Sequence, residues 1–302
     1  MLNPAAMMFS RGDEEAVLEW STGVNARVLE MTGSNLPCDE AEMRAFLTSD
    51  EAEVPAPPMI AQSGYHLATM DHPFLDMSRG TAARVEDAQL MAGYATSDEY
   101  PAIELELEHD RVLDIADAAD LTLDELKNSD LYRFAAIISG TFGVRRHQQP
   151  YSDPVTSYRQ VEIVRKSIPS GGSRHPTELF FEVLRSPAME TGTWHYNPIR
   201  RQIRRVASRT TSSALDSDAD WVIRTHIVSA VRRAMFRYRD PRSFRAILVD
   251  AGHADAQLEA IAKFCNWRYR SSMSVDFTFG QEIGLEGAEI PQLISGSLEG
   301  WA

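Results

Sequence analysis

Residues 165–183 read RKSIPSGGSRHPTELFFEV, a basic pair followed by a Pro-Ser-Gly-Gly turn and then by an apolar segment. Glycine adopts backbone conformations that side chains forbid, so such a turn lets a flat ligand approach the main chain and its N–H groups closely. The arginines on either side of the turn supply donors for an anionic ligand. The stretch therefore predicts a ligand-binding turn that leads into a strand over Glu178–Arg185.

The segment that follows predicts a β-hairpin. Thr193–Tyr196 and Gln202–Val206 are rich in strand-forming residues and flank the turn-forming pair Asn197-Pro198.

Two helices and a terminal arm are predicted after the hairpin. Apolar residues recur at helical spacing across Val222–Met235 and again across Phe244–Cys265. Gly252 lies inside the second pattern and costs about 1 kcal/mol relative to alanine, so we expect close packing against a helix or ligand there. Residues 277–298 are rich in turn formers and are predicted to be a C-terminal arm.

A helix is also predicted before the glycine-rich turn. Asn128–Asp130 can cap its start, and Leu131–Ile138 place their apolar side chains on one face. The glycines at Gly140 and Gly143 are predicted to end it, and residues 144–160 are polar, basic and predicted to be a loop.

Composition places the chain among ordinary globular proteins. Of the 302 residues 43% are hydrophobic and 25% charged, and no apolar run is long enough to predict a membrane span. The N-terminus lacks the pattern of a signal peptide, and two cysteines are too few for a disulfide framework or a metal site. These features predict a cytoplasmic protein without a metal.

The charge is unevenly distributed. Residues 1–110 hold 21 Asp and Glu against 5 Arg, whereas the remainder is nearly balanced. The acidic balance argues against nucleic-acid binding. It predicts an acidic accessory region over 1–110 and a catalytic domain over 111–302, although a merely solvated surface explains the asymmetry equally well. Within the accessory region we expect short helices near 14–20 and 39–47, a Pro-rich linker at 51–58 and a half-buried strand at 103–108.

Four segments, in the same order, resemble the SagB-type branch of the nitroreductase-like FMN enzymes. They are 131–146 (LYRFAAIISGTFGVRR), 169–183, 192–198 (GTWHYNP) and 237–265. The resemblance implies an α+β fold with a central, mostly antiparallel sheet flanked by long helices, a homodimer, and FMN as cofactor. It further implies oxidation of thiazoline or oxazoline rings to azoles in a ribosomally made precursor peptide, with a cyclodehydratase as possible partner.

The resemblance also implies site residues. Tyr238 is the candidate base, and nearby cations would favour its phenolate; Arg237 stands where the family has lysine, and it keeps the charge but cannot take a proton. In the broader family, Ser173 stands at the place of an asparagine and His175 at that of a glutamine. The residues implied to bind FMN are Arg165, Pro169, Ser170, Gly171, Gly172, Ser173, Arg174, His175, Arg242 and Arg245.

Other candidates and readings stay open at this point. Arg145, Arg146 or Arg159 could bind the phosphate, while His253 and His195 are weaker candidates for catalysis. A flavin enzyme acting on another substrate, by dipeptide desaturation or by nitro or quinone reduction, is the second reading. A scaffold subunit that has lost the cofactor is the third, because the family's Lys and its Asn near Leu258 are absent.

Overall fold

The computed structural model describes residues 101–152, 159–210, 217–238, 243–276, 278–285 and 290–301, together with scattered helical positions between 82 and 93. Almost all of these belong to one compact unit, Val85–Ala302. The helices predicted near 14–20 and 39–47, and the linker at 51–58, lie outside the described residues. The domain boundary after residue 110 stays a prediction.

The unit contains both helices and antiparallel strands. In chain order its elements are β1 (Arg111–Asp114), η2 (Ala118–Asp120), α6 (Leu123–Asn128), α7 (Asp130–Phe142), β2 (Val144–Gln148), β3 (Tyr151–Ser152), β4 (Arg159–Gln160), β5 (Ile163–Lys166), η3 (Gly171–Ser173), β6 (Thr177–Arg185), β7 (Gly192–Asn197), β8 (Gln202–Ala207), β9 (Trp221–Ser229), α8 (Val231–Tyr238), α9 (Ser243–Phe264), β10 (Arg268–Asp276), α10 (Thr278–Glu282) and β11 (Gln292–Gly300).

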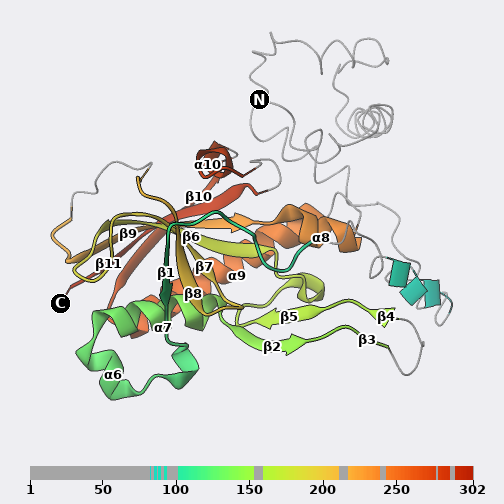
Figure 1. Ribbon diagram of the computed structural model, residues 1–302, viewed down its shortest axis with the longest axis horizontal. Helices are drawn as coiled ribbons and strands as arrows, with labels where there is room; N and C mark the ends of the chain where they lie inside the picture. Colours follow the sequence, from blue (N-terminus) through green and yellow to red (C-terminus); the bar gives the residue numbers. More distant parts are fainter. Residues whose placement is uncertain are drawn as a thin grey trace, which may run out of the picture. The chain divides into compact units, whose positions relative to one another are not determined.

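A seven-stranded sheet forms the centre of the unit (Figure 1). Its order is β1-β8-β7-β6-β9-β11-β10, and every neighbouring pair is antiparallel. The strand expected after the glycine-rich turn is β6, near the middle of the sheet, and the expected hairpin is β7–β8. The predicted α+β class, with a mostly antiparallel sheet and long flanking helices, is therefore confirmed.

Helices α7 and α9 cover one face of the sheet and bury the main core. Phe134 of α7 meets the ring of Phe181 edge-on at 5.3 Å and stacks on Trp221 at 5.7 Å. Burying large aromatic side chains in this way is the main apolar contribution to folding. The Ser129 hydroxyl accepts the N–H of Tyr132 and caps α7, as the sequence predicts.

The predicted end of α7 is right at one glycine and wrong at the other. Gly143 is the C-cap and donates to the carbonyl of Ser139, whereas Gly140 lies inside the helix. A Cβ on Gly140 would come within 2.9 Å of Ile261 on α9, so this glycine permits close helix packing rather than helix termination.

The opposite face of the sheet carries a second, smaller apolar cluster. Phe180, Val228 and Phe279 are buried there, and Leu105 and Leu107 pack against them. The strand predicted at 103–108 is wrong, because this segment has no regular secondary structure and pairs with no strand of the described sheet. It lies with alternate side chains against the cluster, which produces the same period-two pattern as a strand.

The helix predicted across 222–235 is wrong as well. The chain forms strand β9 and then the separate helix α8. Both faces of β9 are covered, so nearly all of its side chains are buried and the polar alternation that identifies a strand is absent. Periodicity alone does not distinguish such a run from a buried helix.

The predicted arm at 277–298 and the predicted loop at 144–160 both contain strands. β11 pairs with β9 and β10 inside the sheet, and β2 pairs with β5 in a ribbon extended by β3 and β4 (Figure 1). Glycine in β11 has a packing role, because a Cβ at Gly296 would meet the ring of Tyr269 at 2.8 Å.

Gly252 does not have the close contact that was expected of it. No atom lies within 4 Å of the position where its Cβ would stand, although it occupies the middle of α9. Gly252→Ala is therefore predicted to stabilise the protein by about 1 kcal/mol, the difference in helix propensity. Urea unfolding of the purified full chain measures this.

Gly140→Ala is the matched control, because it makes the same change in α7 where Ile261 restricts the space. We expect Gly140→Ala to stabilise the protein by less than Gly252→Ala does, or to destabilise it. Equal gains at both positions would contradict this account of the two glycines.

Candidate functional site

The glycine-rich turn between β5 and β6 has an unusual backbone. Gly172 has a φ of 59°, and Ser173 and His175, which are not glycines, have φ values of 55° and 45°. Left-handed conformations are disfavoured for residues with a Cβ and persist only where surrounding contacts impose them. Pro169 and Gly172 are exposed at the surface of the turn.

Asp250 of α9 supplies those contacts. Its carboxylate accepts the Ser170 hydroxyl at 2.6 Å and the Gly171 N–H at 3.1 Å. The Ser170 oxygen in turn accepts the N–H of His175 at 2.8 Å. One nearly buried carboxylate thus joins the turn to the long helix, and burial raises the pKa of Asp250.

Most amides of the turn are therefore already engaged. Besides Gly171 and His175, Ser173 donates to the carbonyl of Ser170 and Arg174 to that of Gly171. The sequence predicted that a ligand would meet the N–H groups of this turn, but four of these groups already donate within the protein. A flat ligand would rest on the exposed surface around Gly172, whose shape these internal bonds fix in advance.

The arginines implied to bind FMN occupy different environments. Arg165 is exposed on β5 opposite Arg146, Arg174 is half-buried beside the turn, and Arg245 is half-buried on α9. Arg145 is held by Ser167 and Asp117, at 2.7 and 3.1 Å. That engagement gives it a structural role in this fold.

The candidate base lies at the end of α8. Arg237 and Tyr238 are described only as backbone there, and Arg242 lies outside the described residues. Their roles stay predictions.

A buried ionic cluster lies beneath the turn, on the sheet face opposite α7 and α9. Glu178 of β6 accepts the ammonium of Lys166 at 3.1 Å and the guanidinium of Arg233, and His195 of β7 lies 3.2 Å from its other oxygen. Burial alone would raise the pKa of Glu178, but the two cations lower it well below its usual range. His195 is thus a partner within this cluster.

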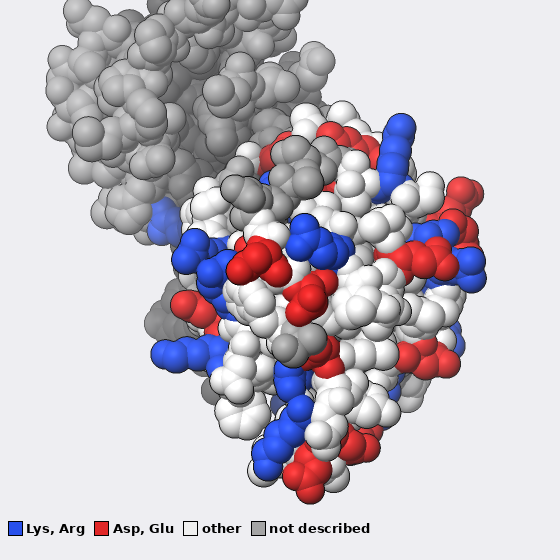
Figure 2. Space-filling view, turned by 90° about the vertical axis from the view of Figure 1, so that its left-hand side faces the viewer, with Lys and Arg blue, Asp and Glu red and all other residues white. Residues whose placement is uncertain are grey.

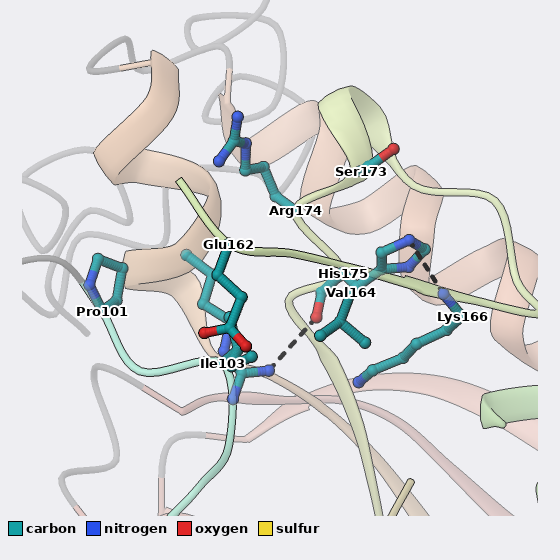
Figure 3. A pocket seen from close by; sticks show the side chains of 9 residues that line it. Pro101, Ile103, Glu162, Val164, Lys166, Ser173, Arg174 and His175 are labelled. Atoms are coloured by element: carbon teal, nitrogen blue, oxygen red, sulfur yellow. Dashed lines mark hydrogen bonds between the residues drawn. The ribbon is translucent and has the colours of Figure 1, made fainter. Parts of the chain in front are cut away.

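His175 forms one wall of a small pocket above this cluster (Figure 3). Its Nε2 accepts the backbone N–H of Lys166 at 3.3 Å, so the proton of the neutral ring is on Nδ1. Burial, followed by the charge of Lys166, lowers the pKa of His175 to about 3. The side chains lining the pocket are Pro101, Ile103, Glu162, Val164, Lys166, Ser173, Arg174, His175 and Arg233.

Sequence reasoning missed Asp250, Lys166 and Arg233 as parts of this site. The sequence did offer a signal for two of them. Asp250 interrupts the apolar pattern of α9 next to Ala251, and Lys166 stands two positions after Val164 on β5, on the face that the structure shows to be buried. Which partners these charges have depends on contacts between residues far apart in the chain, such as Ser170 and Asp250.

Within the described residues, no group of three or more His, Cys, Asp or Glu side chains could hold a metal ion, and no helix is long and apolar enough to cross a membrane. Figure 2 shows basic and acidic side chains interspersed over one face of the described part, without a large field of one sign.

Comparisons with known proteins agree with the predicted resemblance. No family model matches the chain. Over 135 residues it is 33% identical to the trifolitoxin-processing protein TfxB of Rhizobium leguminosarum bv. trifolii, which covers 41% of this chain and 36% of that protein. The chain thus spans about a third of the length of this curated relative.

Solved structures show the nitroreductase-like fold. A structure from Anabaena variabilis that is assigned as a nitroreductase superposes with a TM-score of 0.52 at 14% identity, over 70% of this chain and 46% of that one. A chain of the E. coli microcin synthetase McbBCD complex with truncated pro-MccB17 bound has a TM-score of 0.43 at 18% identity, over 68% and 79%. The second likeness is too low to carry an argument.

Asp250→Ala is predicted to destabilise the protein by about 1–3 kcal/mol, because the Ser170 hydroxyl and the Gly171 N–H lose their acceptor. Amide hydrogen exchange should also accelerate at Gly171 and His175. Asp255→Ala is the control, because Asp255 lies on the same helix as Asp250 but bonds to Tyr269 and Ser271 of β10. It should leave the amide exchange of the turn unchanged.

Acid is predicted to destabilise the fold through its buried histidines. Burial lowers the pKa of His175 to about 3, so the folded protein keeps this ring neutral, and burial also lowers the pKa of His195. The unfolded chain protonates both histidines below about pH 6.5. The free energy of unfolding should be highest above pH 6.5 and fall by about 1.4 kcal/mol per pH unit between pH 6 and 4.5 because of His175, and His195 should add to the fall in the same direction.

Urea unfolding across this range measures the slope, and histidine NMR at pH 5 identifies the protonation state directly. Imidazolium signals for both residues at pH 5 would contradict the prediction.

Proposed function

We propose that the chain is a SagB-type FMN-dependent dehydrogenase that oxidises azoline rings to azoles in a ribosomally made peptide, a proposal supported by its nitroreductase-like fold and its partial likeness to the trifolitoxin-processing protein. The observation that carries this proposal is the turn at Ser170–His175, which is fixed by Asp250 in a left-handed form and exposes a glycine at its surface. The name of the toxin-processing relative supports a peptide as substrate.

The residues of the turn fit a flat cofactor. Gly172 is exposed and has no side chain, so a planar ring can lie against the backbone there. Ser173 and Arg174 stand beside it, and Arg165 or Arg245 would pair with the phosphate. Bound FMN would supply the hydride acceptor, which no amino-acid side chain provides.

The protein's own task in this reaction is to hold the ring of the peptide and to accept a proton. Conversion of an azoline to an azole removes one hydride and one proton from neighbouring ring carbons. We assign the proton to Tyr238, with Arg237 and Arg242 favouring its phenolate. The rigid turn would keep cofactor and substrate from shifting between steps.

Partners follow from the same proposal. A homodimer and a cyclodehydratase that delivers the heterocyclised peptide are the expected partners. The acidic region over residues 1–110 would dock that partner or a basic peptide. Deletion of residues 1–84, which spares the segment at 101–110 that packs on the sheet, tests the docking role, and unchanged complex formation by this shortened chain would rule it out.

The visible absorption spectrum of the purified full chain, with chromatography of the heat-released cofactor, is the first test. The proposal expects about one FMN per chain, bound oxidised and bleached by an azoline peptide under anaerobic conditions. Bleaching without formation of an azole would favour a flavin enzyme that acts on another substrate.

Tyr238→Phe is predicted to retain FMN and to lower the azole-forming rate by roughly 10²–10⁴-fold, the usual contribution of a positioned base. Tyr132→Phe, at a half-exposed position on α7, is the matched control and should retain the rate. If Tyr238→Phe is as active as the control, another group is the base.

A scaffold without cofactor is the second candidate. It is favoured by the internal bonds of the Gly171, Ser173, Arg174 and His175 amides, which leave few donors for a ligand. Colourless protein that fails to bind added FMN while still binding the precursor peptide would establish this reading over the first.

A further inference from the structure

The pocket beside His175 is built from separate segments of the described chain. Lys166 comes from β5, Arg233 from the first turn of α8, and Arg174 and His175 from the end of the glycine-rich turn. Pro101 and Ile103 close its remaining side (Figure 3). Long-range folding thus brings four nitrogen-bearing side chains to one small space.

Two of these side chains present donors that no described acceptor satisfies. They are Nδ1 of His175 and Nη2 of Arg233, each on a side chain that is only 5% exposed. The other Arg233 nitrogens are engaged, Nε with the carbonyl of Ala102 and Nη1 with Glu178. A buried donor without an acceptor costs about 1–3 kcal/mol, so an acceptor is expected in the pocket.

The buried charge beside the pocket is not balanced. Lys166 and Arg233 share one carboxylate, that of Glu178, and none of the three side chains is more than 5% exposed. Arg174 and Glu162, which line the outer wall, have partners of their own, among them His147 for Glu162. Because two buried cations face a single carboxylate, an anionic acceptor is favoured over a neutral one.

The space limits the size of that acceptor. The pocket is partly open to solvent, and its inner space measures about 20 Å³, whereas a single water needs about 10–15 Å³ on the same measure. A group the size of one or two oxygen atoms fits there and a flavin ring does not. Because the pocket opens to solvent, the rest of a ligand can extend outward.

We propose that this pocket binds the carboxylate group of a peptide or small organic acid, with Arg233 Nη2 and His175 Nδ1 donating to its oxygens. The ion pairs with Glu178 hold the cationic walls in place before the ligand arrives. The proposal is independent of the flavin, and it assigns to His175 a role distinct from lining the cofactor.

Titration of the ¹⁵N-histidine-labelled full chain with sodium acetate tests the site directly. We expect a saturable shift of the His175 Nδ1–H signal. We also expect a short peptide with a free C-terminal carboxylate to bind at least about tenfold more tightly than its C-terminal amide, because charge-assisted bonds are lost in the amide.

Arg233→Lys keeps the charge and can still pair with Glu178 but loses the Nη2 donor, so acetate affinity should fall about tenfold. Arg200→Lys makes the same change at an exposed ion pair with Glu104 and should leave affinity unchanged. If Arg233→Lys does not fold, the comparison of acid and amide peptides on the wild-type chain decides.

Three outcomes would overturn the proposal. Acetate that leaves the His175 signal unchanged would indicate that a buried water satisfies the donors. Equal affinity for the acid and amide peptides would exclude carboxylate recognition. Inorganic phosphate or FMN that displaces acetate and binds far more tightly would identify a phosphate site instead.

Discussion

The ion pairs of the buried Glu178 carboxylate are the interaction on which the rest of this structure depends. Its buried carboxylate receives Lys166 from β5 and Arg233 from α8, and contacts His195 on β7. Leaving either cation without its partner would place an uncompensated charge in the interior, a cost of about 3–5 kcal/mol. The ribbon, the sheet and α8 are therefore held in one fixed arrangement, and the wall of the pocket is formed by the groups that pair with this carboxylate.

A second carboxylate, that of Asp250 on α9, has a similar role for the glycine-rich turn. Asp250 fixes the glycine-rich turn through Ser170 and Gly171, and so holds Ser173 and His175 in backbone conformations they would not adopt alone. The same bonds engage the amides that the sequence suggested for a ligand. The amides that make the turn rigid are therefore no longer free to bind a ligand. A ligand here would be positioned mainly by the shape of the turn surface.

Several elements were predictable because their signal is local. The cap at Ser129, the strand after the turn and the hairpin around Asn197-Pro198 depend on residues that are neighbours in the chain. Strand β9 and the neighbouring strand β11 were not predictable in this way. β9 is buried on both faces and lacks polar alternation, and β11 carries glycine where Tyr269 of the adjacent strand needs space.

The sequence by itself determined the α+β class, the family resemblance and the turn at Pro169–His175, because these follow from the order and the types of residues near one another. Tertiary structure alone decided that Asp250 holds the turn, that Lys166 and Arg233 share Glu178, and that His175 faces a cationic pocket. The physical reason is that pairing between charges and the presence of unsatisfied donors depend on distance and burial. Both are set by contacts between residues far apart in the chain, such as Ser170 and Asp250, which are 80 positions apart, and Ala102 and Arg233, which are 131 apart.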